Sequence, residues 1–272
     1  MTTSYTLSTI SQLVELGTTL TRSWFRGHAV IQDNITPRLF RSEFVIQRNC
    51  AQNLESTLID HFKREAPVLA DNVPKDDDHI SWLFLMQHHG TPTRLLDWSL
   101  SPLIAMYFVV SAAPKLDGEL WALHPESLNK ISGEYGIFLP HHNIVRYFAD
   151  ESHWVDKSNL IQKLHLNKIP QFPIALYPPV HFQRLAAQLS TFTIHPEPKE
   201  GNTIPELLDD EKKLVRYIIP AAVKHQLFCD LNALCITRRA LFPDLDGLSH
   251  TIVDYYSRFL AYTPPQPPRC KE

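Results

Sequence analysis

Sixteen consecutive residues, Gln87 to Pro102, constrain this chain more than any other segment. Their sequence is Gln-His-His-Gly-Thr-Pro-Thr-Arg-Leu-Leu-Asp-Trp-Ser-Leu-Ser-Pro, and an apolar helix pattern lies on each side. Amide, imidazole, hydroxyl, guanidinium and carboxylate groups near a hydrophobic core must each be hydrogen-bonded or solvated. A core alone does not require so many polar groups, and the segment therefore indicates a site.

The flanking patterns predict where helices end and begin. The run 76–78 of three aspartates suits the cap of a helix that must stop before Pro92. Ser101 and Pro102 suit the N-cap and the first position of an almost wholly apolar helix over 103–113. That run is shorter than the about 18 apolar residues that a membrane span needs, so we expect no membrane association.

Helical and strand patterns alternate along the rest of the chain without a regular βαβ rhythm. Helices are predicted at 9–20, 54–66, 221–234 and 247–260, and strands at 23–29, 118–123, 172–177, 190–195 and 214–219. The stretch from 125 to 170 gives no assignment. The mixture is typical of the α+β class. We predict an N-terminal helix in 1–20, one domain over 21–262 and a proline-rich tail over 263–272.

Composition excludes several classes of protein. The 272 residues are 44% apolar and 20% charged, which is typical of a globular chain rather than a disordered one. The net charge of −3 gives no global attraction for nucleic acid. Five N-terminal arginines form either a solvated face or a groove for a polyanion: Arg22, Arg26, Arg38, Arg41 and Arg48. The four cysteines form no C-x-x-C pair, which favours a reduced, cytoplasmic chain without a zinc site.

Two motifs resemble the FRG domain family, which is named for an aromatic-Arg-Gly sequence. Phe25-Arg26-Gly27 matches that sequence. The segment Gln87-His88-x-Gly90-x-Pro92-Thr93-Arg94-Leu95-Leu96-Asp97-Trp98-Ser99-x-Ser101-Pro102 resembles the family's central motif. Segments 184–192 and 241–248 also resemble the family pattern, so the resemblance covers residues 20 to 250.

The order of the motifs is also similar to that of ADP-ribosyltransferases of the Arg–Ser–Glu type. This resemblance implies a split β-sheet flanked by helices, with NAD as co-substrate. Arg26 matches the arginine of the first strand, and Ser99-x-Ser101 matches the serine motif. Gln188 stands where those enzymes carry their late glutamate, which makes ordinary arginine-directed transfer doubtful.

The resemblance leads to two main hypotheses for the function. The first is an NAD-dependent transferase that acts as a toxin or antiphage defence effector, modifies RNA, DNA or protein with nucleic acid favoured, and is neutralised by an antitoxin protein. The second is a non-catalytic module that binds a nucleotide or nucleic acid in the same pocket. Metal-dependent hydrolysis by His88 and Asp97 is a third and weaker hypothesis, because no ligand spacing supports a metal.

The resemblance implies the candidate residues, and the chemistry of NAD gives the physical reasons for their roles. A guanidinium can hold a pyrophosphate, a carboxylate can stabilise the oxocarbenium character that develops at the ribose, and an aromatic ring can stack on nicotinamide. We therefore expect catalytic roles for Arg26, His88, Asp97 and Gln188, and NAD-binding roles for Arg26, Gly27, Thr93, Arg94, Trp98, Ser99 and Ser101. Structural alternatives remain: an Arg94–Asp97 ion pair, Trp98 in the core, and Ser101 as a helix cap only.

Overall fold

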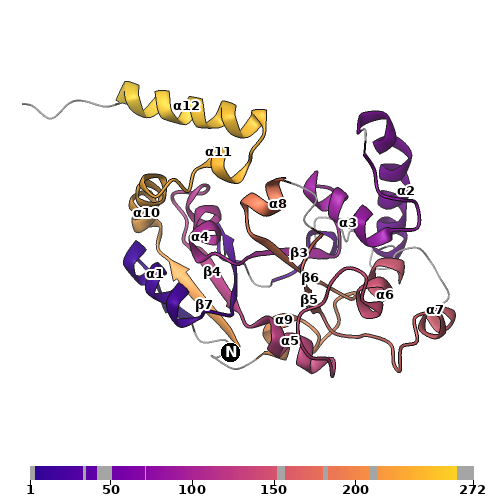
Figure 1. Ribbon diagram of the computed structural model, residues 1–272. Coiled ribbons are helices and arrows are strands. Elements are labelled where there is room, and N and C mark those ends of the chain that lie inside the picture. Colours follow the sequence, from indigo (N-terminus) through magenta and orange to yellow (C-terminus); the bar gives the residue numbers. More distant parts are fainter. Residues whose placement is uncertain are drawn as a thin grey trace, which may run out of the picture.

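The computed structural model describes residues 4–32, 35–41, 51–70, 72–151, 157–179, 183–208 and 213–261. Within them, seven strands form one sheet in the order β1-β7-β4-β2-β3-β6-β5 (Figure 1). The strands are β1 (Ser4–Thr6), β2 (Trp24–His28), β3 (Leu95–Ser99), β4 (Gly118–Leu123), β5 (Ile174–Leu176), β6 (Ser190–Ile194) and β7 (Leu214–Ile219). β1 pairs in parallel with β7, and the other neighbours are antiparallel.

The sheet is split between β2 and β3. β2 is paired with β4 along its whole length, and β3 is paired with β6 in the same way. Between β2 and β3 only Phe25 and Ser99 are in register. Arg26 follows Phe25 on β2 and Asp97 precedes Ser99 on β3, so neither residue is paired across the split.

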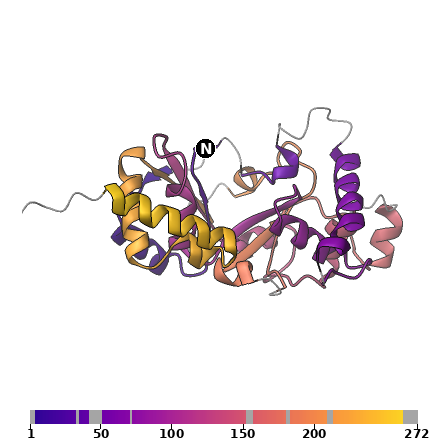
Figure 2. The same cartoon turned by 90° about the horizontal axis from the view of Figure 1, so that it is seen from above.

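Helices surround both halves of the sheet. They are α1 (Ile10–Thr19), α2 (Ala51–Leu69), α3 (His79–His88), α4 (Pro102–Val110), α5 (Pro125–Ile131), α6 (Asn143–Glu151), α7 (Lys157–Lys163), α8 (Gln183–Ala187), α9 (Ile204–Leu207), α10 (Ala221–Ala233), α11 (Arg238–Leu241) and α12 (Leu245–Ala261), with a 3-10 turn η1 (Arg38–Phe40). α1, α4 and α10 share one hydrophobic core with β2, β4 and β7. α3, α6 and α7 share another with β3, β5 and β6. Figure 2 shows α12 and α2 at opposite ends of the molecule.

Local sequence signals explain where the helices begin. Thr9 and Gln12 form a reciprocal capping box on α1, and Asp78 accepts the amide of Ser81 at the start of α3. Ser101 accepts the amide of Ile104 and is followed by Pro102 at the first position of α4. The short connection between β3 and α4 keeps the helix start beside the split in the sheet.

Gly27 permits the close packing of β2 on α4. A Cβ atom at this position would overlap the carbonyl oxygen of Ala105 and the side chain of Val109. Only glycine therefore lets the strand that carries Arg26 lie this close to the helix backbone.

The predicted α+β class is confirmed, with differences in detail. β1 was not predicted, and neither was β3, which occupies the middle of the polar segment. The unassigned stretch 125–170 contains α5, α6 and α7. The proposed tail 263–272 lies outside the described residues. In the part of the chain that the structure describes, every helix is too short or too polar to cross a bilayer.

Candidate functional site

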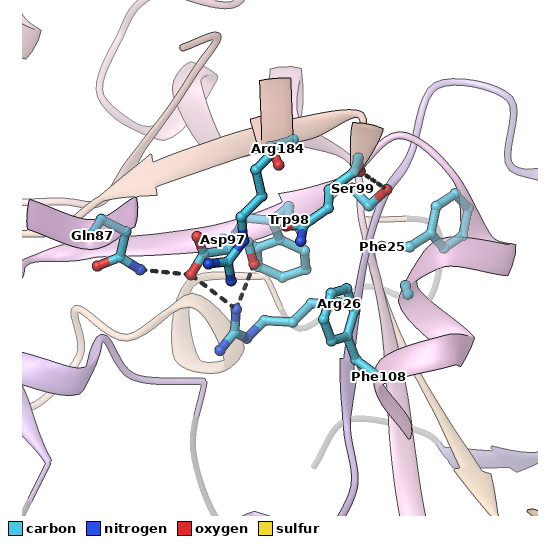
Figure 3. Close-up of a pocket in the computed structure, with 12 residues that line it drawn as sticks. Phe25, Arg26, Gln87, Asp97, Trp98, Ser99, Phe108 and Arg184 are labelled. Atoms are coloured by element: carbon cyan, nitrogen blue, oxygen red, sulfur yellow. Dashed lines mark hydrogen bonds and ion pairs between the residues drawn. The ribbon is translucent and has the colours of Figure 1, made fainter. Parts of the chain in front are cut away.

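A cavity of about 240 Å³ lies at the split between β2 and β3 (Figure 3). Strands β2, β3 and β6 and helices α3, α4 and α8 contribute its walls. Its lining residues come from three of the four motif segments (25–27, 87–102 and 184–192) and from α4: Phe25, Arg26, Gly27, Gln87, Asp97, Trp98, Ser99, Ala105, Phe108, Arg184, Gln188 and Ser190. The cavity therefore brings Arg26, Ser99 and Gln188 together, as the motif comparison requires.

Among the described residues that line this cavity, Asp97 is the one that carries a carboxylate group. Its side chain is 49% exposed. One carboxylate oxygen, Oδ2, accepts a hydrogen bond of 2.6 Å from Gln87 Nε2. The hydroxyl of Thr93 donates in turn to Gln87 Oε1 over 2.7 Å, which fixes the orientation of the amide. The carboxylate is thus held in place on one side and open to the cavity on the other.

Arg26 crosses the split from β2 to β3. Its Nη1 donates to the main-chain oxygen of Asp97 over 2.6 Å and lies 3.9 Å from Oδ2 of the same residue. Its Nε donates to Nε2 of His28 over 2.9 Å. Burial, with a contribution from the nearby charge of Arg41, lowers the pKa of Arg26 to about 10, so the guanidinium stays protonated at neutral pH.

His28 orients Arg26 on the side away from the cavity, and Glu119 orients His28. Because Nε2 of His28 accepts from Arg26, the proton of the neutral ring sits on Nδ1, which lies 2.8 Å from Glu119 Oε1. Arg216 binds the other carboxylate oxygen of Glu119 over 2.7 Å. Burial lowers the pKa of His28 to about 4, which keeps the ring neutral and able to accept. These side chains lie on one face of β2, β4 and β7.

The hydrogen bond and charges around Glu119 stabilise its ionised form. Burial alone would raise the pKa of this carboxyl group, but its bond with His28 and the charge of Arg216 lower it below the usual value. A buried carboxylate therefore balances the charge of Arg216, while the charge of Arg26 remains directed toward the cavity.

Arg184 reaches the cavity from α8 and extends toward Asp97 (Figure 3). Its Nη1 donates to the main-chain oxygen of His88 over 3.2 Å, and its guanidinium lies 4.5 Å above the ring of Phe242. Burial lowers the pKa of Arg184 from its usual value, and the charge of Asp97 opposes that effect. Two guanidinium groups and one carboxylate thus face the same space, which favours an anionic ligand.

Ser99 and Gln188 close the end of the cavity where the two sheet halves meet. Ser99 Oγ donates to the main-chain oxygen of Gln188 over 2.8 Å and accepts the amide of Ser101. The side-chain amide of Gln188 donates to the main-chain oxygen of Leu241 over 3.1 Å. The position that the transferase comparison assigns to a glutamate therefore carries an amide that is itself hydrogen-bonded.

Several predicted site residues lie outside this cavity. Arg94 is buried and binds Glu55 on α2 with two nitrogens, so its ion-pair partner is Glu55 and not Asp97. The imidazole of His88 does not line the cavity, although its carbonyl anchors Arg184. Thr93 acts through Gln87, and Ser101 caps α4.

Trp98 borders the cavity but belongs to the core. It is 3% exposed, and its indole N–H donates to Thr193 Oγ1 over 3.1 Å. It shares a hydrophobic cluster with Trp24 and Trp121. The ring most available to a ligand is that of Phe108 on α4, which Figure 3 shows beside Arg26.

Sequence reasoning missed five residues that build the site: Gln87, Phe108, Arg184, His28 and Glu119. A signal existed for Gln87 and Arg184, because each lies inside a motif segment, and Arg184 precedes Gln188 by one helical turn. Phe108 lies in the apolar helix pattern predicted over 103–113. No sequence signal pointed to Glu119, which meets His28 only because β2 and β4 pair in register. Among the described residues, no three His, Cys, Asp or Glu side chains gather as metal ligands do.

Comparison with known proteins identifies the domain that carries most of this site. A sequence model of the FRG domain matches residues 21–118, and the chain therefore contains an FRG domain. The matched residues include Arg26, Gln87, Asp97 and Ser99. The predicted resemblance of 184–192 and 241–248 lies beyond the match and stays a prediction. No curated protein and no solved structure matches the chain.

Proposed function

We propose that the cavity at the split binds NAD and that the protein transfers ADP-ribose from it to an acceptor. The observation that carries the proposal is the half-exposed carboxylate of Asp97 between two guanidinium groups, Arg26 and Arg184. Cleavage of the bond between nicotinamide and ribose develops positive charge at the sugar, and a fixed carboxylate stabilises that charge. The guanidinium groups suit the pyrophosphate.

The proposed division of labour follows from what each group already binds. Gln87 holds one oxygen of Asp97, so the other is free to accept from a ribose hydroxyl or to face the developing cation. Arg26 is aligned by His28, so little freedom is lost when it binds a phosphate oxygen. Neutral nicotinamide leaves with the bonding electrons, and the acceptor's nucleophile, or water, adds to the ribose carbon and loses a proton.

The motif order supports this reading, and so does the meeting of Arg26, Ser99 and Gln188 at one cavity. The biological setting that we propose is that of a toxin or defence effector inside a cell. It would require an antitoxin partner in the cell that makes it. Expression of the wild-type chain should then be toxic, and expression of Arg26→Ala should be harmless.

The enzymatic test is release of nicotinamide from labelled NAD, with total RNA, DNA and protein supplied as acceptors. Asp97→Asn keeps an oxygen for Gln87 but removes the charge, and we expect a loss of about 10²-fold or more in turnover. Asp60→Asn on α2 is the matched control, because Asp60 is exposed and does not line the cavity. Equal turnover by both variants would contradict the proposed role of Asp97.

A second candidate function has its own supporting observation. The motif order assigns Gln188 to the position of the transferase carboxylate, and its side-chain amide donates to the main-chain oxygen of Leu241. A module that binds the same phosphate-bearing ligand without turnover needs no carboxylate there. A folded wild-type protein that binds ADP-ribose through Arg26, but releases no nicotinamide with any acceptor, would favour this function.

A further inference from the structure

The C-terminal motif, residues 241–248, covers the end of α11 and the start of α12. It lies beyond the FRG match, and none of the described residues that line the cavity at the split belongs to it. α11 nevertheless contacts α8, the helix that carries Arg184 (Figure 1). The C-terminal motif is therefore placed to act on the cavity through residues that do line it.

The ring of Phe242 contacts two side chains that line the cavity. The guanidinium of Arg184 lies 4.5 Å from the centre of this ring, and the ring of Phe108 meets it edge-on with 6.2 Å between the centroids. The face of an aromatic ring attracts a guanidinium without neutralising its charge. Phe242 therefore supports Arg184 from outside the cavity and leaves its charge available inside.

The neighbouring main chain holds a third lining residue. The side-chain amide of Gln188 donates to the main-chain oxygen of Leu241 over 3.1 Å. Gln188 also follows Arg184 by one helical turn, and its main-chain amide donates to the main-chain oxygen of Arg184 over 3.0 Å. Two consecutive residues, Leu241 and Phe242, thus bind both side chains that the stretch 184–188 contributes to the cavity.

Phe242 is itself fixed by contacts within the C-terminal motif. Its main-chain amide donates to the main-chain oxygen of Arg238 over 2.7 Å. A Cβ atom on Gly247 would overlap the carbonyl oxygen of Phe242, so only glycine lets the first turn of α12 pack so closely. The carboxylate of Asp244 accepts the main-chain amide of Gly247 over 2.6 Å. The ring is therefore held in place without help from a ligand.

Charge alone does not decide where the guanidinium of Arg184 lies. Burial lowers the pKa of Arg184, and the charges of Asp97 and Asp244 both oppose that effect. Asp97 lines the cavity, whereas Asp244 does not. The side chain is thus attracted by one carboxylate at the cavity and by another outside it. Its stack on Phe242 and its bond to the main-chain oxygen of His88 favour the position at the cavity.

We propose that Phe242 is a positioning residue, whose ring holds the guanidinium of Arg184 at the cavity so that it can bind an anionic ligand there. A guanidinium that is oriented in advance loses less side-chain entropy on binding than a mobile one. Loss of the ring therefore lowers affinity although no contact to the ligand is removed. The proposal rests on the proposed function only for the identity of the ligand as a dinucleotide.

The experiment is equilibrium binding of ADP-ribose and of inorganic pyrophosphate to the full chain. Phe242→Leu keeps apolar bulk but removes the aromatic face, and it should weaken binding by about three- to tenfold. Phe242→Tyr keeps the face and should bind as the wild type does. Phe228→Leu is the matched control, because Phe228 is also partly buried against the same hydrophobic cluster but does not line the cavity.

Thermal unfolding of each variant identifies any protein that has lost its structure. Phe242→Met, which also lacks an aromatic face, replaces Phe242→Leu if the latter does not fold.

The double variant Phe242→Leu with Arg184→Gln distinguishes positioning from a general loosening of the structure. If Phe242 acts through Arg184, its ring has nothing to position once the guanidinium is gone. The double variant should then bind ADP-ribose as Arg184→Gln does, within about twofold. Losses that multiply would show that Phe242 acts independently of Arg184, and they would overturn the proposal.

Nuclear magnetic resonance of protein with isotopically labelled arginine gives a readout that needs no ligand. The Nε–H signal of Arg184 is assigned by its absence from Arg184→Gln, and a proton above an aromatic face is shifted by the ring. Phe242→Leu should move this signal, whereas Phe242→Tyr and Phe228→Leu should leave it in place.

The outcomes separate this proposal from the function proposed above. Wild-type affinity of folded Phe242→Leu overturns the positioning role, even if nicotinamide is released, and so does an equal loss in Phe228→Leu. A folded wild-type protein that binds neither ADP-ribose nor pyrophosphate contradicts the proposed function instead. The Arg184 signal then decides the role of Phe242, because an unmoved signal in Phe242→Leu overturns it.

Discussion

Arg26 and Arg94 come from the two motifs of one domain, yet their surroundings differ. The side chain of Arg94 is 4% exposed and donates hydrogen bonds to both carboxylate oxygens of Glu55, whose side chain is 1% exposed. Arg26 is 14% exposed and binds a carbonyl oxygen and a neutral histidine, with its nearest carboxylate oxygen 3.9 Å away. The charge of Arg94 is neutralised inside the protein, whereas that of Arg26 is available to a ligand. The partner of a motif arginine, and not its burial, indicates its role.

The largest expected effect is on the Arg94 side. Arg94→Met leaves the buried carboxylate of Glu55 without its partner, and removal of one member of a buried ion pair costs about 3–5 kcal/mol. Arg26→Met leaves a carbonyl and a histidine nitrogen unsatisfied, which costs about 1–3 kcal/mol. Urea unfolding of both variants measures the difference in free energy of unfolding.

The double variant Glu55→Leu with Arg94→Met provides the control. Replacing both members of a buried ion pair by apolar residues is often neutral, so most of the stability should return. The comparison fails if Arg26→Met destabilises the protein as much as Arg94→Met, or if Arg94→Met costs less than 1 kcal/mol.

The sequence identified the residues of the site better than their roles. Arg26, Asp97, Ser99 and Gln188 were predicted and do line one cavity. Arg94 was predicted to bind NAD or Asp97, because nothing local distinguishes it from Arg26. Its partner Glu55 lies 39 positions earlier, and only the packing of α2 against α3 and η1 brings them together. Sequence patterns report local periodicity, and they contain no direct record of such long-range pairs.

The second-largest expected effect is a pH dependence of stability that arises at His28, which accepts a hydrogen bond from Arg26. Burial lowers the pKa of His28 from 6.5 to about 4, and Arg26, Glu119 and Arg41 are the charged groups that face it. As the pH falls, His28 is therefore protonated in the unfolded chain before it is protonated in the folded protein. The contribution of the neutral ring to the free energy of unfolding is fully present above pH 6.5 and is lost as the pH falls toward 4. The shift corresponds to about 3 kcal/mol.

His28→Gln provides the matched variant for this prediction. Glutamine can accept from Arg26 and donate to Glu119, but it does not titrate. Unfolding measured between pH 8 and pH 4 should show a steeper loss of stability for the wild type than for His28→Gln. Other groups, including His195 with a pKa lowered to about 3 by burial, contribute to both proteins and cancel in the difference. Parallel pH profiles would contradict the assigned role of His28.

The third effect tests whether the close packing of β2 against α4 is needed to position Arg26. Gly27→Ala forces a methyl group into the backbone of α4 and should cost about 1–3 kcal/mol. Gly136→Ala is the matched control, because its positive φ of 84° should cost about 1–2 kcal/mol, although nothing lies within 4 Å of the new Cβ. ADP-ribose binding should weaken for Gly27→Ala and stay unchanged for Gly136→Ala. Equal affinities would show that Arg26 tolerates a displaced strand.

The fold itself was only partly predictable for a related reason. Capping signals gave the starts of α3 and α4, because a cap is a local interaction. β3 was missed because five residues between two helices, rich in polar groups, give too short a pattern to recognise as a strand. Its identity as a strand depends on β6, whose residues follow 91 or more positions later.

The smallest expected effect concerns Arg184, which is intermediate between the two arginines. Its guanidinium is partly exposed, stacks on Phe242 and binds one carbonyl, so Arg184→Gln should cost about 1 kcal/mol of stability or less. Arg238→Gln is the matched control, because Arg238 lies 5.1 Å from the same ring but does not line the cavity at the split. Both variants should unfold at similar urea concentrations. Only Arg184→Gln should weaken ADP-ribose binding, by about tenfold. If both variants bind ADP-ribose as the wild type does, Arg184 belongs with Arg94 as a structural arginine, and Arg26 alone carries the charge that the cavity offers.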